Sequence, residues 1–348
     1  MKQAAKKSNA PTIWRWIPGI VVSLIAVIAL ISFVGIGDSL KIILSTPIVY
    51  LAVTAMFTVL FLIVRSLGWK ALLGKQATFK ETFLKINEGY FVNNIFPFRL
   101  GEISRALFMG NTLKVHPAKI LSTIVVERAF DLIILAILLL NMIPYALGLE
   151  INQIYIWVLL ISMLLGLLIL FLVVRYQNFV IKKLSWIGKK LPFLEKMVLP
   201  LIYSFLEGFN ILTKPSQFFL GFLGVAGSWF VSLFQYSLFL RLMVPNAAWW
   251  WGAFGNVAMA FGIALPSAPG GIGIFEGTII AVLKLFEINE TTALAYALVL
   301  HVVHFLITAV IGLFALYRDG ISIKGLYSRL MNQDLKTMES QQRGEVND

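Results

Sequence analysis

Residues 91–105 read Phe91-Val-Asn-Asn-Ile-Phe-Pro-Phe-Arg-Leu-Gly-Glu-Ile-Ser-Arg105, a polar and charged stretch inside a strongly apolar chain. Charged side chains are costly at bilayer depth, so such a cluster marks a functional site. Pro97 and Gly101 interrupt the helix at the same place. Irregular backbone persists in a membrane only where protein or a water-filled cavity surrounds it. The stretch therefore predicts a broken helix that shelters polar groups, and residues 265–276 form a second broken stretch.

The composition of the chain predicts an all-α, polytopic integral membrane protein. Of the 348 residues, 59% are hydrophobic and 13% are charged, against about 45–50% and about 25% in a soluble domain. The net charge is +12, but the basic residues gather beside apolar segments, as the positive-inside rule expects, and we expect no nucleic-acid partner. The chain has no cysteine, which excludes disulfides and cysteine-bound metals.

The apolar segments predict six full crossings and two re-entrant helical hairpins, where a plain hydropathy count would give about eight spans. The hairpins cover residues 79–113 and 247–287, because the pieces on either side of each break are shorter than the ~20 residues that a crossing needs. Basic residues without acids before the first crossing place the N-terminus in the cytoplasm at the cell membrane, and the sixth crossing ends at Arg318 on the same side, so we expect the C-terminus there as well. The predicted crossings are residues 14–36, 46–66, 119–147, 152–174, 216–243 and 290–317.

We expect residues 1–318 to form a single membrane domain, followed by a partly disordered cytoplasmic tail over residues 319–348. Residues 175–214 alternate lysines with large apolar side chains, which predicts interfacial helices that anchor on an anionic leaflet; a lipid or partner site is the alternative. The basic residues after the second crossing are interpreted as cytoplasmic flanking charges. They are Arg65, Lys70, Lys75, Lys80 and Lys85.

The order of crossings and hairpins predicts an inverted repeat, with residues 46–147 as one half and residues 216–317 as the other. Inverted repeats with broken helices near the bilayer midplane are typical of secondary transporters. The spacing agrees: Glu127 follows Glu102 by 25 residues, and His301 follows Glu276 by 25 residues.

The first break supplies the candidate residues Asn93, Asn94, Arg99, Glu102 and Arg105. A helix that restarts here presents free N–H groups, which favour an anionic group, and guanidinium groups suit phosphate. The alternative is structural: Glu102 and Arg105 share a helix face and would pair with each other.

The third crossing adds Glu127, Arg128 and Asp131, with the two acids four residues apart on one face. Ionisable groups inside a crossing pair with one another or with a neighbouring charge. They therefore either contact a substrate or neutralise Arg99 and Arg105.

The second break supplies Pro269, Gly270, Gly271, Gly273 and Glu276. Its glycines allow a nest of N–H groups, although a plain hairpin turn is the alternative. It lacks the Lys-Ser/Thr of a P-loop, and no strand precedes it.

His301 and His304 lie three residues apart on the last crossing. We expect them to titrate or to contact a headgroup. A metal site with Glu276 is disfavoured, because two histidines and one acid lack a metal-binding motif. We expect no metal and no cofactor.

These three motifs together resemble the transmembrane region of lysylphosphatidylglycerol synthases, the flippase-like membrane half of the multiple peptide resistance factor. The resemblance covers about residues 15–320. In the full synthase a soluble domain transfers lysine to phosphatidylglycerol, and this chain has no room for that domain. The resemblance therefore implies a free-standing lipid-translocation half. The matching stretches are Asn93-Asn94…Pro97…Arg99-Leu-Gly101-Glu102…Arg105, Glu127-Arg128…Asp131 and Pro266…Pro269-Gly-Gly-Ile-Gly-Ile-Phe-Glu276.

Three functions are compatible with the sequence. The favoured one is translocation of an anionic or aminoacylated phospholipid, or of a polyprenyl-phosphate-linked lipid, with the candidate residues contacting the headgroup. The second is a non-catalytic membrane partner of a separately encoded lipid-modifying enzyme or glycosyltransferase. The third is an intramembrane enzyme acting on a lipid phosphate, with Glu127, Asp131, His301 and His304 as acid–base groups.

Overall fold

The protein is all-helical in the part of the chain that the computed structural model describes, and no strand occurs there. That part comprises residues 28, 36–96, 100–148, 199–209, 213–263, 269–322 and 325, with isolated positions between 154 and 183. The predicted crossings 14–36 and 152–174, most of the interfacial segment and nearly all of the tail lie outside it.

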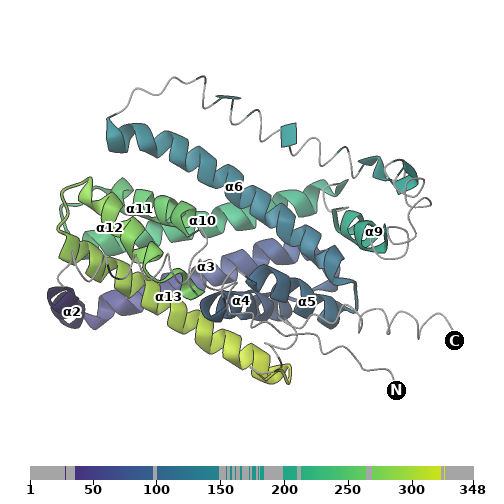
Figure 1. Ribbon diagram of the computed structural model, residues 1–348, viewed down its shortest axis with the longest axis horizontal. Helices are drawn as coiled ribbons and strands as arrows, with labels where there is room; N and C mark the ends of the chain where they lie inside the picture. The colour runs from purple at the N-terminus through teal and green to yellow at the C-terminus, as the bar shows by residue number, and fades with distance from the viewer. Residues whose placement is uncertain are drawn as a thin grey trace, which may run out of the picture.

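Four long helices run along the length of the molecule (Figure 1). They are α3 (Ile48–Leu73), α6 (Pro117–Leu147), α10 (Pro215–Met243) and α13 (Glu290–Arg318). α3 (with the 3-10 turn η2, Gly74–Gln76, that follows it), α10 and α13 are long and apolar enough to cross a membrane. The predicted crossings 119–147, 216–243 and 290–317 agree with α6, α10 and α13 to within about two residues.

Both predicted hairpins consist of two short helices separated by a break. The first contains α4 (Phe79–Ile95) and α5 (Gly101–Leu113); the second contains α11 (Trp249–Gly262), the 3-10 turn η6 (Pro269–Gly271) and α12 (Ile274–Lys284). A capping box of Thr78 and Glu81 fixes the start of α4. The two hairpins lie toward opposite ends of the long axis (Figure 1), as an inverted repeat requires. The other described helices are α2 (Ile36–Ser45) and α9 (Leu199–Gly208).

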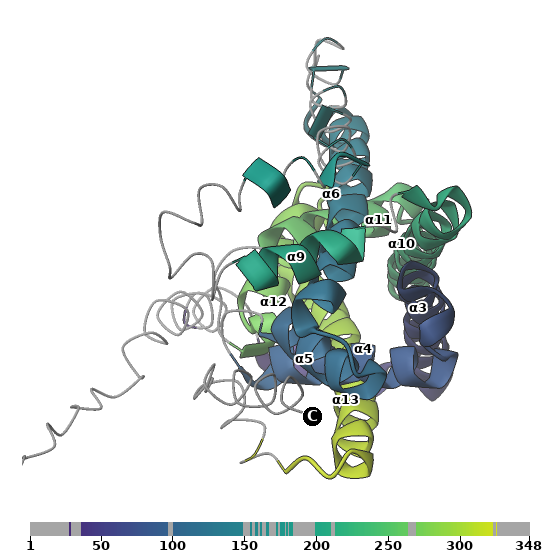
Figure 2. The same cartoon turned by 90° about the vertical axis from the view of Figure 1, so that its right-hand side faces the viewer.

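Helix packing has the same pattern in the two halves. Where α3 packs on α4, α4 on α5 and α5 on α6, α10 packs on α11, α11 on α12 and α12 on α13. Across the halves, α4 contacts α13 and α11 contacts α6, while α3 packs along α10 (Figure 2). This exchange of partners is what a two-fold relation between residues 46–147 and 216–317 would produce.

Small residues allow the closest of these approaches. A Cβ at Gly68 of α3 would lie 3.0 Å from the backbone of Gly224 on α10, and one at Gly224 would collide with Gly68. A Cβ at Gly312 of α13 would meet Phe91 of α4 at 2.5 Å. Lipid is as apolar as the surfaces of the helices, so the hydrophobic effect does not drive helices together in a membrane. Close packing at small residues does so instead.

The expectation that Arg65 and Lys85 are flanking charges is wrong. α3 continues past residue 66 to Leu73, so Arg65 lies within the helix and is 4% exposed. Lys85 lies in α4, is 1% exposed, and pairs with Glu88 at 3.0 Å and with Asp319. Both bases are inside because carboxylates meet them there: Glu127 and Asp131 of α6 meet Arg65, and Glu88 of α4 and Asp319 after α13 meet Lys85.

Candidate functional site: a buried charge network beside two helix breaks

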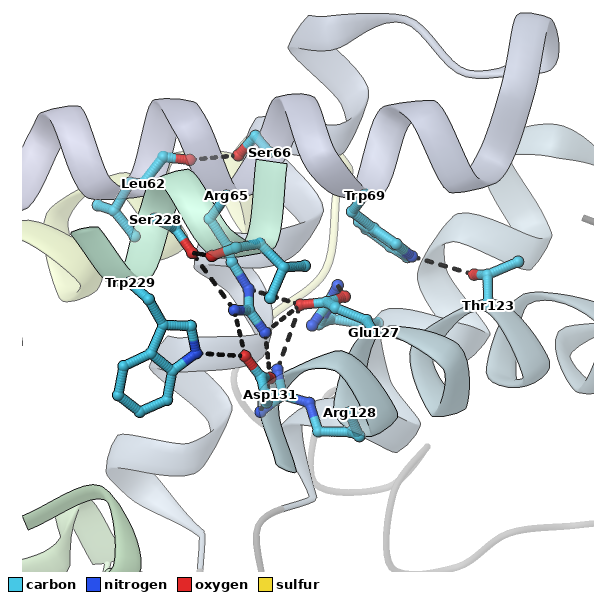
Figure 3. Close-up of polar contacts among 12 residues, drawn as sticks. Leu62, Arg65, Ser66, Trp69, Thr123, Glu127, Arg128, Asp131, Ser228 and Trp229 are labelled. Carbon is cyan, nitrogen blue, oxygen red and sulfur yellow. Dashed lines mark hydrogen bonds and ion pairs between the residues drawn. The ribbon is translucent and has the colours of Figure 1, made fainter. Parts of the chain in front are cut away.

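The centre of the site is Arg65, which points from α3 between two carboxylates of α6 (Figure 3). Its Nη2 lies 2.6 Å from Oε1 of Glu127 and 2.5 Å from Oδ2 of Asp131. Its Nε donates to Glu127 at 2.7 Å and its Nη1 donates to Asp131 at 2.7 Å. Short, charge-assisted bonds of this kind are the strong ones, so α3 and α6 are locked together here.

Two further arginines complete the network. Arg105 of α5 donates to Oε2 of Glu127 at 2.6 Å. Arg128 of α6 is bound more loosely, at 3.2 Å from Glu127 and 3.3 Å from Asp131. Its side chain is 34% exposed, against 4% for Arg65 and 6% for Arg105. Arg128 is therefore the arginine of the network that is most accessible to another molecule.

Neighbouring side chains orient this network. The indole N–H of Trp229 on α10 donates to Asp131 at 3.0 Å. The guanidinium of Arg105 lies 4.1 Å from the ring centroid of Trp69, a cation–π contact. The Trp69 indole donates to Thr123 at 3.0 Å. Gly89 of α4 makes room for Arg105, whose Cγ would be 2.6 Å from a Cβ at that position. Helices α3, α5, α6 and α10 thus all fix the arginines.

The network holds three guanidinium groups and two carboxylates, which leaves one positive charge. Glu102 lies at the start of α5, three residues before Arg105. Oε2 of Glu102 is buried without a hydrogen-bond partner among the described residues, as are Nε of Arg128 and Nε of Arg105. Buried polar atoms are normally satisfied, so these atoms are candidate contacts for a ligand.

The structural alternative for the first break, a pairing of Glu102 with Arg105, does not occur, because Arg105 turns to Glu127 instead. The start of α5 is also less open to an anion than the sequence suggested. The N–H of Gly101 donates to Oδ1 of Asn93 at 2.7 Å, so α4 caps α5 across the break. Asn94 donates to Oγ1 of Thr308 on α13 at 3.1 Å. Both amides therefore hold helices together.

The second break is built on three glycines in a left-handed conformation. Gly270, Gly271 and Gly273 have φ of 70°, 73° and 85°, a region that other residues enter at a cost. The N–H of Gly273 donates to Oε2 of Glu276 at 2.7 Å. Oε1 of Glu276 lies 2.6 Å from Nδ1 of His301. Nε2 of His301 lies 2.9 Å from the carbonyl oxygen of Gly270, which closes a ring of contacts.

The two breaks meet, as the sequence predicts. η6 packs against α4, and a Cβ at Gly270 would lie 3.7 Å from the carbonyl oxygen of Asn94. Near this junction, the ring of His304 lies 5.5 Å from that of Tyr90 on α4 and 6.3 Å from that of Phe61 on α3. His301 and His304 therefore face different neighbours. Within the described residues, no group of three metal-ligating side chains comes together.

Comparison with known proteins agrees with this architecture. A family model described as the lysylphosphatidylglycerol synthase TM region matches residues 16–312. The chain belongs to this family. No solved structure matches.

Two relatives of this family member come from the archaeon Methanocaldococcus jannaschii. The UPF0104 membrane protein MJ1595 is 29% identical over 131 residues, which cover 36% of this chain and 39% of that relative. The UPF0104 membrane protein MJ1078 is 25% identical over 232 residues, which cover 65% of this chain and 93% of that relative. The chain thus spans well under half of the first relative and nearly all of the second.

Sequence reasoning missed Arg65, the most extensively paired residue of the network. One signal was available: the apolar run of α3 before Arg65 is only about 17 residues long, short of the ~20 that a crossing needs. Arg99 and Pro97 lie outside the described residues. Of the remaining candidates, the structure joins Arg105, Glu127, Arg128 and Asp131 in one network, and joins Gly270, Gly273, Glu276 and His301 in another.

Proposed function

We propose that this member of the family translocates a membrane lipid by binding its charged headgroup between the two halves. The observation that carries the proposal is the buried network of Arg65, Arg105, Glu127, Arg128 and Asp131 beside the junction of the two breaks. Structural needs alone rarely place five ionised groups inside a membrane domain, and such groups mark substrate pathways in transporters.

The headgroup would be anionic, with or without an added amine. Arg128 carries the charge that the two carboxylates leave uncompensated, and its exposed edge suits a phosphate or phosphodiester. The unpartnered oxygen of Glu102 suits a cationic group, such as the amine of an aminoacylated lipid. The alternatives to a phospholipid are polyprenyl-phosphate-linked lipids, which carry the same phosphate chemistry.

Rocking of the two halves around this site would expose it to each side of the membrane in turn, as in transporters with inverted repeats. In this proposal the protein resides in the cell membrane with both ends in the cytoplasm, and a separately encoded enzyme supplies or consumes the lipid. Acid–base catalysis by Glu127 and Asp131 is less well supported, because arginines already occupy both carboxylates.

Purified protein in vesicles of phosphatidylcholine and phosphatidylglycerol tests the proposal. The probe is phosphatidylglycerol with a fluorescent acyl chain, and the readout is the fraction that an impermeant quencher reaches over time. Wild-type protein should speed the exchange between leaflets over protein-free vesicles. Arg128→Gln should slow it at least tenfold, whereas Arg128→Lys should retain part of it.

The matched control is Lys284→Gln, which removes one positive charge from an exposed side chain outside the site. It should leave the rate unchanged. Exchange at the protein-free rate in wild-type vesicles, with this probe and with an aminoacylated phosphatidylglycerol probe, would contradict the proposal. So would equal rates for Arg128→Gln and Lys284→Gln.

A further inference from the structure

We infer that Glu276 and His301 together hold one exchangeable proton, and that losing it opens the contact between the two breaks. In the proposed translocator this proton is the coupling ion. The inference therefore rests on the proposed function for its transport meaning, although the proton site itself is independent of it.

The proton count follows from the partners of the imidazole. The carbonyl oxygen of Gly270 can only accept a hydrogen bond, so Nε2 of His301, at 2.9 Å, carries a hydrogen. On the other side of the ring, Nδ1 lies 2.6 Å from Oε1 of Glu276. A lone pair on Nδ1 facing an ionised carboxylate at that distance would repel it. One further proton must therefore lie between them, on Nδ1 or on the carboxyl group.

Removal of that proton breaks one of the two contacts of His301. If Nε2 keeps the remaining hydrogen, Nδ1 and Glu276 present only acceptors to each other. If the hydrogen moves to Nδ1, Nε2 and the carbonyl oxygen of Gly270 present only acceptors. No tautomer of neutral His301 satisfies both contacts while Glu276 is ionised, so the two contacts together require one more proton than either contact alone.

Gly270, one of the two partners of His301, lies at the junction of the halves. Gly270 lies against the carbonyl of Asn94 on α4, and η6 packs against α4. Glu276 also accepts from the N–H of Gly273, so it fixes the start of α12 as well as the histidine. A change at this pair therefore acts on the second break, on α12 and on α13, which all contact it.

Few other groups can supply or mask this proton. The ring of Phe275 stacks on His301 at 4.4 Å, and α11 and η6 contain no ionisable side chain. Lys284 of α12 is exposed near the far end of that helix. Tyr296 of α13, Tyr236 of α10 and Tyr50 of α3 belong to, or pack against, the apolar cluster that contains Phe275, and His304 lies beside Tyr90 of α4. The charged side chains Arg65 of α3 and Lys85 and Glu88 of α4 are paired in ion pairs that do not include Glu276 or His301.

The proton can be observed directly, because the chain has only three histidines. Protein labelled with ¹⁵N-histidine in lipid nanodiscs should show a titrating imidazole signal set that His301→Gln removes, which assigns it to His301. Glu276→Gln should abolish that titration, since the amide can donate to Nδ1 and accept from Gly273 without an exchangeable proton. His116→Asn is the control, because it removes a histidine at the start of α6. A signal of His301 that titrates equally in Glu276→Gln would overturn the inference.

A lipid-exchange assay at different pH values is the second test of the inference. With fluorescent phosphatidylglycerol in vesicles, wild-type exchange should change by up to tenfold per pH unit across the titration. Glu276→Gln should be slower and independent of pH. Lipid exchange that proceeds without any pH dependence, in wild-type protein, overturns the coupling and leaves translocation standing. Absence of any exchange, together with a titration of His301 that needs Glu276, overturns the translocation proposal and leaves the proton site standing.

Discussion

The two helix breaks have the same arrangement of helices, but different kinds of ionisable side chains lie beside them. The first lies beside three arginines that two carboxylates neutralise only in part. The second lies beside one carboxylate and one histidine that share a proton between them. The comparison suggests a division of labour: one half keeps a fixed charge for a ligand, and the other holds a charge that can change.

The difference extends to how each break is held. At the first break the side chain of Asn93 reaches across from α4 to cap α5. At the second, Glu276 caps its own helix, and backbone glycines with positive φ shape the turn. A neutral side-chain amide holds the first break, while the second depends on a protonation state and on glycine.

The largest effect should come from Arg65→Ala. It leaves Glu127 and Asp131 without their closest partner inside the protein, and breaking a buried pair in this way costs about 3–5 kcal/mol. Thermal unfolding of purified protein in nanodiscs would measure the loss. Lys284→Ala removes an exposed partner of Glu290 and should cost about 0–1 kcal/mol. Equal unfolding temperatures for the two variants would show that the network contributes no stability.

Next, replacing each of the two carboxylates by its amide should destabilise the protein to different extents at the two breaks. Glu127→Gln removes a charge that three arginines contact and should destabilise by about 3 kcal/mol or more. Glu276→Gln should cost about 1 kcal/mol, because an amide can replace both hydrogen bonds. Denaturation of the two variants side by side measures the difference. The distinction between fixed and changeable charge fails if Glu276→Gln is the more damaging change.

The glycine-based turn offers a smaller contrast. Gly270→Ala places a side chain at φ of 70°, which should cost about 1–2 kcal/mol. Gly277→Ala lies in α12 with nothing within 4 Å of the added Cβ, and should stabilise the helix by about 0.5–1 kcal/mol. Unfolding midpoints of the two variants should therefore move in opposite directions. A shift in the same direction would mean that the turn does not require its glycines.

The smallest effect concerns His116, which lies outside both breaks. It caps α6 by accepting from the N–H of Ala118 at 3.1 Å, and burial lowers the pKa of its imidazole below the usual 6.5. A folded pKa below the unfolded one means that this stabilisation is present above pH 6.5 and is lost as the pH falls. His116→Asn should keep the cap and remove about 0.5–1 kcal/mol of acid sensitivity, measured as the difference in Tm between pH 7.5 and pH 5. An unchanged difference would contradict this role.

The sequence predicted the helices, both breaks and their meeting, because the cost of polar groups in lipid leaves few arrangements. It identified Arg105, Glu127, Arg128 and Asp131 as interacting residues for the same reason. It did not predict which residue each one contacts. Arg105 turns to Glu127 rather than to Glu102, since the choice depends on how α5 packs against α6.

Arg65 and Lys85 show why the remainder could not be predicted. Counting basic residues near the end of a crossing treats every one as a flanking charge. That rule takes no account of carboxylates that are distant in the sequence and close in the fold. Asp131 of α6 is such a partner for Arg65, and Asp319 is such a partner for Lys85. Close packing through Gly68 and Gly224 draws α3 toward α10 and sets where Arg65 can reach.

The most direct test is whether the two breaks touch inside the bilayer. Since the chain has no cysteine, Asn94→Cys with Gly270→Cys gives a single pair that a short bifunctional thiol reagent can join in native membranes, followed by mobility on a gel. The pair should cross-link, because a Cβ at Gly270 would lie 3.7 Å from the carbonyl oxygen of Asn94, which places the two residues in contact. Asn94→Cys with Lys284→Cys, at the far end of α12, should not. Failure of the first pair to cross-link, or equal rates for both pairs, would contradict a shared site.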